Sequence, residues 1–243
     1  MKLTVLGCSG SYPAADCACS GYLIEHEGTA VAVDLGPGAL AALQRHLDLD
    51  RLDGVVLTHE HADHWIDLAV LHVAARFALE REGLPVWGTS GNLAMAQILM
   101  DDLSPTFDWR VTGPEDHFEF GGLEFSFERT DHYVETLAVR IDAADGTSIV
   151  YSSDTGPEWS IERLGHGVDL ALVESTFIDE ESAAGIKHLW ASLAGEQARA
   201  AGAERCVLTH FWPGTAAVDH QRAGSTGFGG PVLVASPHST FEL

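Results

Sequence analysis

A short segment near residue 60 has the composition of a metal-binding motif. The stretch THEHADH, residues 58–64, contains three imidazoles and an aspartate. Imidazole nitrogen and carboxylate oxygen are donors suited to zinc, manganese or iron. His59 and His61 point the same way in an extended segment because side chains alternate with period two, and Asp63 and His64 then turn away. The sequence therefore predicts ligands for two ions here, with a surface histidine-rich loop as the alternative.

This cluster cannot complete two metal sites, so distant ligands are required. The candidates are His132, which follows Thr130-Asp131, Asp154 in the stretch SSDTG, and His210 at the end of an apolar run. An aspartate placed between two cations can bridge them with its two oxygens. Several chemistry-bearing residues directly follow apolar, strand-like runs: Asp34, His59, Asp154, Glu174 and His210. Groups at the ends of several strands are the usual way in which an α/β scaffold builds a site.

The elements that must position these residues alternate between short apolar strands and helical stretches. Strands are expected at 3–6, 21–25, 30–34, 55–57, 118–120, 123–129, 136–141, 148–152, 170–173, 205–209 and 232–235. Helices are expected at 39–46, 68–80, 93–100 and 189–201, whereas 214–230 reads as a loop. The 243 residues are sufficient for a core and predict a single α/β domain over 1–243.

Composition excludes several classes of protein. The formal net charge is -23, from 36 acidic and 13 basic residues, which disfavours a polynucleotide partner. No apolar run approaches the ~20 residues that span a bilayer, and the N-terminus lacks the features of a signal peptide, so we expect no membrane partner and a cytoplasmic location. The four cysteines form no CxxC pair and predict no disulfide framework.

With these motifs in order, the sequence resembles the metallo-β-lactamase superfamily of metal-dependent hydrolases. The signature of that superfamily is H-x-H-x-D-H followed by separate His, Asp and His motifs, and its opening aspartate matches Asp34 in the stretch VDLG. The resemblance covers roughly Leu3 to Trp212. It implies an αββα sandwich of two mixed β-sheets flanked by helices.

The resemblance also implies the ligand sets. One metal takes His59, His61 and His132, the other takes Asp63, His64 and His210, and Asp154 bridges them. The implied cofactors are two divalent metal ions, with Zn²⁺ expected and Mn²⁺ or iron as alternatives. Asp34 is expected to orient a ligand from outside the coordination sphere. Capping of the turn at residues 36–38 is its alternative role.

Two further segments resemble the ribonuclease Z-like phosphodiesterase branch. They are the first loop, LGCSGS at 6–11, and the stretch VESTF at 173–177, which resembles a Glu-Ala-Thr segment of that branch. His188 matches a histidine that pairs with the glutamate, here Glu174, and the pair is implicated in proton delivery. Asp63 is expected to orient the attacking water or to accept its proton. Metallo-β-lactamases proper usually have cysteine at the position of Asp154, so antibiotic hydrolysis is disfavoured.

These features predict a dinuclear hydrolase that attacks a small anionic phosphodiester, such as a cyclic nucleotide, through a metal-bound hydroxide. Processing of the 3′ end of transfer RNA, as by ribonuclease Z, is disfavoured because no basic arm is present. Lactone or ester hydrolysis remains an alternative, and a non-catalytic metal-bearing binding module is an alternative from another class. Related proteins often form homodimers, although this sequence carries no specific interface signal.

Overall fold

The computed structural model describes residues 1–100 and 102–243. Their contacts divide the chain into two compact units. The N-terminal unit contains residues 2–113 and 236–242, and the C-terminal unit contains Met1, residues 114–235 and Leu243. Within the described ranges, none of the helices has the length and apolar character needed to cross a membrane.

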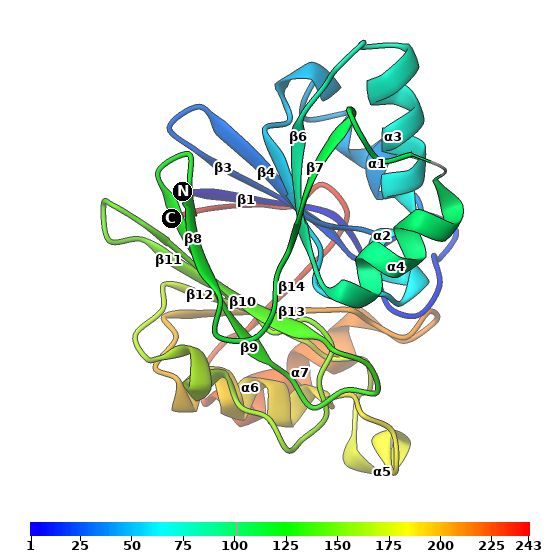
Figure 1. The fold of residues 1–243 in the computed structure, drawn as a ribbon. Helices are drawn as coiled ribbons and strands as arrows, with labels where there is room; N and C mark the ends of the chain where they lie inside the picture. Colours follow the sequence, from blue (N-terminus) through cyan, green and yellow to red (C-terminus); the bar gives the residue numbers. More distant parts are fainter. Residues whose placement is uncertain (101) are drawn as a thin grey trace. The chain divides into compact units, whose positions relative to one another are not determined.

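The N-terminal unit is built on one mixed sheet (Figure 1). Its strands are β1 (Lys2–Ser9), β2 (Ala18–Cys19), β3 (Gly21–His26), β4 (Thr29–Leu35), β5 (Gly54–Val56), β6 (Leu84–Gly88), β7 (Phe107–Val111) and β15 (Thr240–Glu242). The order is β15-β1-β3-β4-β5-β6-β7, with β2 paired to β1. Pairing is antiparallel from β15 to β4 and parallel from β4 to β7. Parallel neighbours need crossover connections, which place helices against the sheet.

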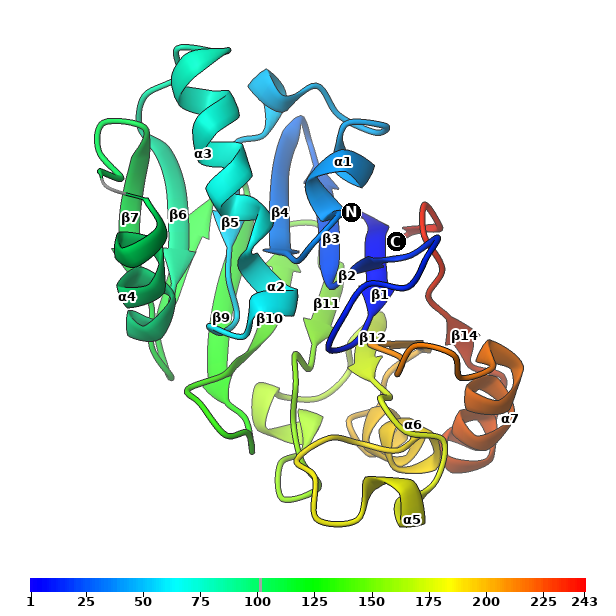
Figure 2. The same cartoon turned by 90° about the vertical axis from the view of Figure 1, so that its right-hand side faces the viewer.

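Those helices are α1 (Ala39–Leu43), α2 (Ala62–Trp65), α3 (Asp67–Phe77) and α4 (Ser90–Leu99), with a 3₁₀ turn at Leu49–Arg51. Figure 2 shows α1 and α3 running along the strands of this sheet. On α3, Leu68, Leu71 and Ala75 are buried at helical spacing, which gives the helix one apolar face. Leu68 and Leu71 share a core with Leu6 and Val55 of the sheet. This packing fixes the turn between β5 and α3, which carries the histidine cluster.

The C-terminal unit is built on a second mixed sheet. Its strands are β8 (His117–Phe120), β9 (Leu123–Arg129), β10 (Leu137–Ala143), β11 (Ser148–Tyr151), β12 (Leu170–Glu174), β13 (Arg205–Thr209) and β14 (Leu233–Val234). Its helices are α5 (Glu180–Ala183), α6 (Ala191–Ala200) and α7 (Ala217–Phe228), with a 3₁₀ turn at Ile161–Leu164. The order is β14-β13-β12-β11-β10-β9-β8, parallel from β14 to β11 and antiparallel beyond.

The helices α6 and α7 lie side by side (Figure 1). They approach so closely that glycine is required at the contact. A Cβ atom at Gly195 would overlap the carbonyl oxygen of Gly224, and one at Gly227 would overlap the carbonyl oxygen of Ser192. The loop prediction for residues 214–230 is therefore wrong over most of its length. Glycine disfavours an isolated helix, but here it permits the packing that stabilises one.

The other differences concern short elements, among them the four-residue helix α5, which the sequence analysis does not predict. The sequence analysis places no strand at 84–88 or 107–111, where β6 and β7 lie, because Pro85 interrupts the first and alternating polar residues obscure the second. The strand expected at 232–235 shortens to β14. Two mixed sheets flanked by helices nevertheless confirm the predicted fold class.

Candidate metal centre

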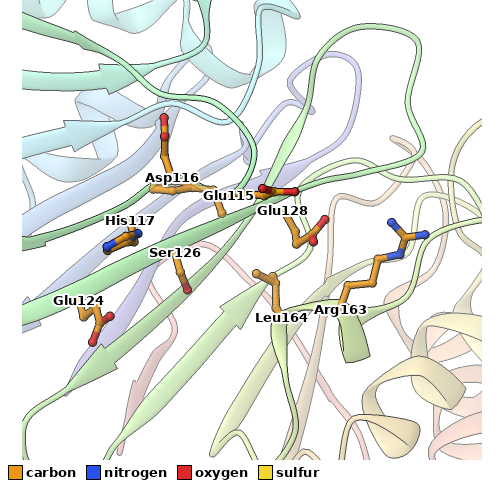
Figure 3. A pocket seen from close by; sticks show the side chains of 9 residues that line it. Glu115, Asp116, His117, Glu124, Ser126, Glu128, Arg163 and Leu164 are labelled. Atoms are coloured by element: carbon orange, nitrogen blue, oxygen red, sulfur yellow. The ribbon is translucent and has the colours of Figure 1, made fainter.

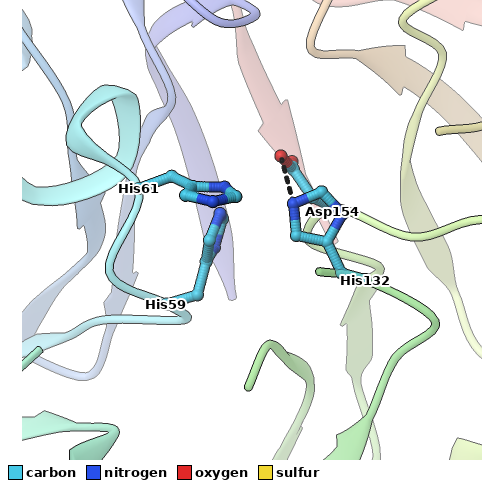
Figure 4. A group of neighbouring side chains, drawn as sticks. All are labelled: His59, His61, His132 and Asp154. Atoms are coloured by element: carbon cyan, nitrogen blue, oxygen red, sulfur yellow. Dashed lines mark ion pairs between the residues drawn. The ribbon is translucent and has the colours of Figure 1, made fainter. Parts of the chain in front are cut away.

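In the N-terminal unit, the histidine cluster occupies the turn after β5 and the first helical turn beyond it. His61 precedes α2, while Asp63 and His64 belong to it. The rings of His59 and His61 lie edge to face with centroids 4.9 Å apart (Figure 4). The ring of His64 lies 4.1 Å from that of His59. The structure thus gathers these predicted ligands of the N-terminal unit at one place.

A buried carboxylate holds two of these histidines. Asp34 Oδ2 lies 2.7 Å from Nδ1 of His64, and Asp34 Oδ1 accepts from the Thr58 amide at 2.9 Å. The Thr58 hydroxyl donates to the Asp34 carboxylate and lies 3.1 Å from Nδ1 of His59. A positive φ of 59° at Asp34, which is uncommon for a residue other than glycine, aims the carboxylate at this pair.

The carboxylate of Asp63 is held by the first loop. The Ser11 amide donates to Asp63 Oδ2 at 2.7 Å. Ser11 itself has a positive φ of 62°, so the loop adopts an uncommon conformation at the residue that makes this contact. A Cβ atom at Gly36 would overlap the carbonyl oxygen of Asp63, which explains glycine at that position. Asp63 is therefore fixed from both its backbone and its side chain.

The backbone of the histidine turn is also anchored. The Asn92 side-chain amide donates to the carbonyl oxygen of His59 at 2.7 Å, and the Trp65 indole donates to that of Glu60 at 2.9 Å. Asn92 is buried and forms a capping box with Thr89 at the start of α4. The N-terminus of α4 thus holds the turn that carries His59.

In the C-terminal unit, the predicted ligands lie at the carboxyl ends of strands. Asp154 follows β11, and His210 directly follows β13. Asp154 Oδ1 lies 3.3 Å from Nε2 of His210, while its Oδ2 lies 3.9 Å from Nε2 of His132 (Figure 4). All three side chains are buried. One carboxylate therefore presents its two oxygens to two different imidazoles.

A second buried carboxylate holds the remaining groups. Glu174, the last residue of β12, has Oε1 2.8 Å from Nδ1 of His188. Its Oε2 accepts from the Thr176 hydroxyl at 2.7 Å, and that hydroxyl lies 2.9 Å from Nδ1 of His210. The rings of His188 and His210 stack with centroids 5.4 Å apart. Potential ligand atoms of Asp154, His188 and His210 all lie within 4.8 Å of one another.

The loop that carries His132 is tied to its neighbours. His132 Nδ1 lies 3.1 Å from the carbonyl oxygen of Lys187, and Lys187 Nζ pairs with Asp131 Oδ1 at 2.6 Å. The pairing with Asp131 raises the pKa of Lys187. The Gly156 amide donates to the carbonyl oxygen of Asp131 at 2.6 Å, and a Cβ atom at Gly156 would overlap the Asp131 carboxylate. These contacts join the loops of His132, Asp154 and His188.

The histidines fit divalent metal ions because the contacts of their Nδ1 atoms favour the tautomer whose Nε2 can bind a metal. The Nδ1 atoms of His59, His64, His132 and His210 face a threonine hydroxyl, a carboxylate or a backbone carbonyl. An Nδ1–H that donates to such an acceptor leaves the lone pair on Nε2, the arrangement that metal-bound histidines adopt. Each unit therefore contributes histidines in a tautomer suited to coordination.

Two cavities in the C-terminal unit differ in their relation to these residues. One, of about 470 Å³, is lined by acidic side chains from 115 to 128 and by Arg163 (Figure 3), and includes none of the predicted site residues. The other, of about 430 Å³, is lined by Asp131, Ile186, Lys187 and Trp190 among others. Its lining residues flank His132 and His188 in sequence.

Sequence analysis missed several of these contacts. Thr58 and Thr176 stand next to predicted site residues, so an adjacent hydroxyl was the available signal. Asn92 and Ser11 lie far from the histidine motifs in sequence, and the Lys187 carbonyl lies 55 positions from the His132 that it contacts, so only the fold brings these groups near. In the turn at 36–38, whose capping is the alternative role of Asp34, the Gly36 amide donates to the carbonyl oxygen of Ser20, while the Asp34 carboxylate contacts Thr58 and His64.

Comparison with known proteins agrees with this architecture. An uncharacterised protein of Mycobacterium tuberculosis, Rv1339, is 33% identical over 253 residues. The alignment covers 100% of this chain and 92% of Rv1339. The probable metallo-hydrolase YhfI of Bacillus subtilis is 31% identical over 252 residues and the full length of both chains. The crystal structure of YhfI matches with a TM-score of 0.90 at 27% identity, over 99% of this chain and 98% of that one.

More distant structures share the fold alone. Human tRNase Z, short form, has a TM-score of 0.79 at 20% identity and covers 100% of this chain and 99% of its own. Yeast PDE1 has a TM-score of 0.77 at 12% identity, with coverage of 100% and 99%. The profile of the β-lactamase superfamily domain matches residues 29–211. The chain therefore belongs to the β-lactamase superfamily and has the metallo-β-lactamase fold.

Proposed function

We propose that this protein is a metal-dependent hydrolase in which the two units act as one domain over residues 1–243. Two divalent ions, expected to be zinc, would be held by one set of His59, His61 and His132 and another of Asp63, His64 and His210. Asp154 would bridge them. The observation that carries the proposal is the Asp154 carboxylate, whose two oxygens face Nε2 of two different histidines. The similar protein YhfI of Bacillus subtilis is named a probable metallo-hydrolase, which supports the same chemistry.

The ions, when bound, would supply charge neutralisation for an anionic substrate and Lewis-acid activation of water. This chain's own residues supply the rest. Asp63, with one oxygen held by the Ser11 amide, would orient the attacking water or accept its proton. His188, whose Nδ1 is held by Glu174, can deliver a proton from Nε2 to the departing oxygen. Glu174 also accepts from the Thr155 amide at 2.9 Å, which fixes its carboxylate toward the imidazole.

We infer that the substrate is a small phosphodiester, such as a cyclic nucleotide. The net charge of -23 repels a polynucleotide. The cavity lined by Lys187 and Trp190 offers the indole of Trp190 for a flat ring such as a nucleobase, whereas the ammonium of Lys187 is paired with Asp131. A proton donor such as His188 suits an alkoxide leaving group, which ribose provides.

The direct test measures metal content and hydrolysis together. Purified protein is analysed for bound metal and incubated separately with cyclic AMP, bis(p-nitrophenyl) phosphate, a precursor tRNA and a lactone. We expect about two divalent ions per chain and hydrolysis of cyclic AMP. Cleavage of the tRNA alone, or of the lactone alone, would overturn the substrate assignment. A protein that binds both ions but hydrolyses nothing would favour the binding module.

The role of His188 is tested by the leaving group. His188→Ala should lower kcat on cyclic AMP by about 10²- to 10⁴-fold, because an alkoxide leaves poorly without a proton. It should change kcat on bis(p-nitrophenyl) phosphate far less, because nitrophenolate leaves unprotonated. His166→Ala removes an exposed histidine of the same unit and serves as the control. Equal losses on both substrates would assign His188 a positioning or ligand role instead.

A further inference from the structure

Two thiols meet at the base of the first loop. Cys8 lies near the end of β1, and Cys17 directly precedes β2. Their Sγ atoms are 3.5 Å apart. Cys8 is buried, whereas Cys17 is half-buried and thus accessible to a small reagent. The proposed hydrolysis uses neither residue.

The two thiols differ in acidity because they share one hydrogen bond. Either sulfur can be the donor, and donation from the Cys8 thiol stabilises a thiolate at Cys17 and lowers the pKa of Cys17 to about 6. The same hydrogen bond, together with burial, raises the pKa of Cys8 far above its usual value. Burial raises the pKa of both Cys19 and Cys206 to about 12. Cys17 is therefore the most acidic of the four cysteines, and the thiolate is the nucleophile in disulfide chemistry.

The loop between these thiols contacts a proposed metal ligand. It contains Ser11, whose amide donates to Asp63 Oδ2. The Ser9 hydroxyl donates to the carbonyl oxygen of Tyr12 at 2.8 Å, which helps to shape the loop. A Sγ–Sγ separation of 3.5 Å must shorten to about 2.0 Å in a disulfide, so bond formation moves the loop ends. We therefore expect formation of this disulfide to shift the Ser11 amide relative to Asp63.

We infer that Cys17 is a modification site for low-molecular-weight disulfides and that Cys8 converts the adduct into a Cys8–Cys17 disulfide. In the first step the Cys17 thiolate attacks one sulfur of the reagent RSSR, breaks its S–S bond and releases RS⁻. In the second step Cys8 gives its proton to RS⁻ and attacks Cys17 Sγ, which releases the second RS⁻. The two cysteines are oxidised by two electrons, and RSSR is reduced to one RSH, which carries the proton of Cys8, and one RS⁻, which takes a proton from water.

The modification is tested without metal or substrate. The purified full chain is incubated with oxidised glutathione, and mass spectrometry with peptide fragmentation locates the products. The wild-type protein should lose two hydrogens. Cys8→Ser should retain one glutathione on Cys17, Cys17→Ser should take none, and Cys19→Ser should behave as wild type. If a variant fails to fold, the Cys8–Cys17 disulfide can still be located in the wild-type protein by peptide fragmentation, so the test remains decisive. Glutathione on Cys19 or Cys206, or an unmodified Cys17 in Cys8→Ser, would overturn the assignment.

The consequence for Asp63 rests on the proposed function and has its own readout. Oxidation of the wild-type protein should weaken zinc binding by about tenfold in a chelator competition, and dithiothreitol should restore it. Cys17→Ser should show the same zinc affinity with and without oxidised glutathione. A Cys8–Cys17 disulfide with unchanged zinc affinity would overturn the coupling to Asp63. A protein that binds no zinc in either state would instead count against the proposed metal centre and leave the mass-spectrometric result standing.

Discussion

Thr58 and Thr176 occupy equivalent places in the two units, each between a buried carboxylate and a histidine. Each hydroxyl donates its one hydrogen to Asp34 or Glu174 and so can only accept from the imidazole. The adjacent Nδ1 of His59 or His210 must then carry the proton. A residue with no place in the metal motif thereby selects the tautomer that binds metal.

Replacing Thr176 with valine should therefore weaken metal binding with little loss of fold. The variant keeps the volume of the side chain but leaves Nδ1 of His210 without its acceptor, so we expect a 10- to 100-fold lower metal affinity, on the order seen for such supporting contacts. Isothermal titration of the metal-free protein with zinc measures the change.

Thr112→Val is the matched control, since Thr112 is also buried and its hydroxyl donates to the carbonyl oxygen of Arg110. Equal zinc affinities of the Thr176 and Thr112 variants would contradict the role given to Thr176.

For individual residues, the sequence predicts the proposed metal ligands better than it predicts the residues that hold these ligands by hydrogen bonds. The histidines and aspartates are recognisable because few other functions place three imidazoles within residues 58–64. A threonine beside them is commonplace, and Asn92 has no motif at all. The contact of Asn92 with His59 depends on how α4 approaches the histidine turn, and local sequence does not encode that approach.

Among the elements, the start of α4 links helix stability to the histidine turn. Asn92 accepts from the Thr89 hydroxyl and amide, and it donates to the carbonyl oxygen of His59. Thr89 in turn accepts from the Asn92 amide. The two residues share the cap, but only Asn92 reaches the turn.

This difference predicts distinct effects of two alanine variants. Thr89→Ala and Asn92→Ala should each lower the free energy of unfolding by about 1–2 kcal/mol through loss of the cap. Asn92→Ala should also reduce zinc affinity, because the His59 backbone is then less constrained. Denaturant unfolding and zinc titration of both variants measure the two quantities. A Thr89→Ala protein with the same loss of zinc affinity would show that the cap alone is responsible.

Element prediction succeeded where one signal dominated. Apolar runs that end in a polar residue predict β12 and β13 correctly, because a short, continuous apolar run is typical of a strand that is buried on both faces. The helix α7 was missed because its glycines lower helix propensity and hide the apolar face. Its stability comes from contact with α6, which lies outside any local window.

For the molecule as a whole, buried ionisable groups set the response to acid. His220 in α7 is fully buried, with Nδ1 2.9 Å from the Ser175 hydroxyl and Nε2 3.0 Å from the Thr215 hydroxyl. Burial lowers its pKa to about 4, although the neighbouring Asp219 opposes the shift. Below its ordinary pKa of 6.5, the unfolded chain binds a proton that the folded chain resists.

Stability should therefore fall as pH drops from about 6.5 to 4, with His220 contributing up to about 3 kcal/mol of the loss. His220→Gln can keep both hydrogen bonds without titrating, so its free energy of unfolding should vary less over this range. Denaturant unfolding of both proteins at several pH values measures the difference. Parallel pH profiles would show that His220 is not the group responsible.

The glycine contact between α6 and α7 also restricts how this sequence can change. Both helices pack on the sheet whose strand ends carry Glu174 and His210. Even one methyl group at Gly195 or Gly227 would act as a wedge, since backbone atoms already fill that space. Substitutions at positions outside the proposed metal centre could thus inactivate the protein, and we expect these glycines to vary as little among related sequences as the proposed metal ligands do.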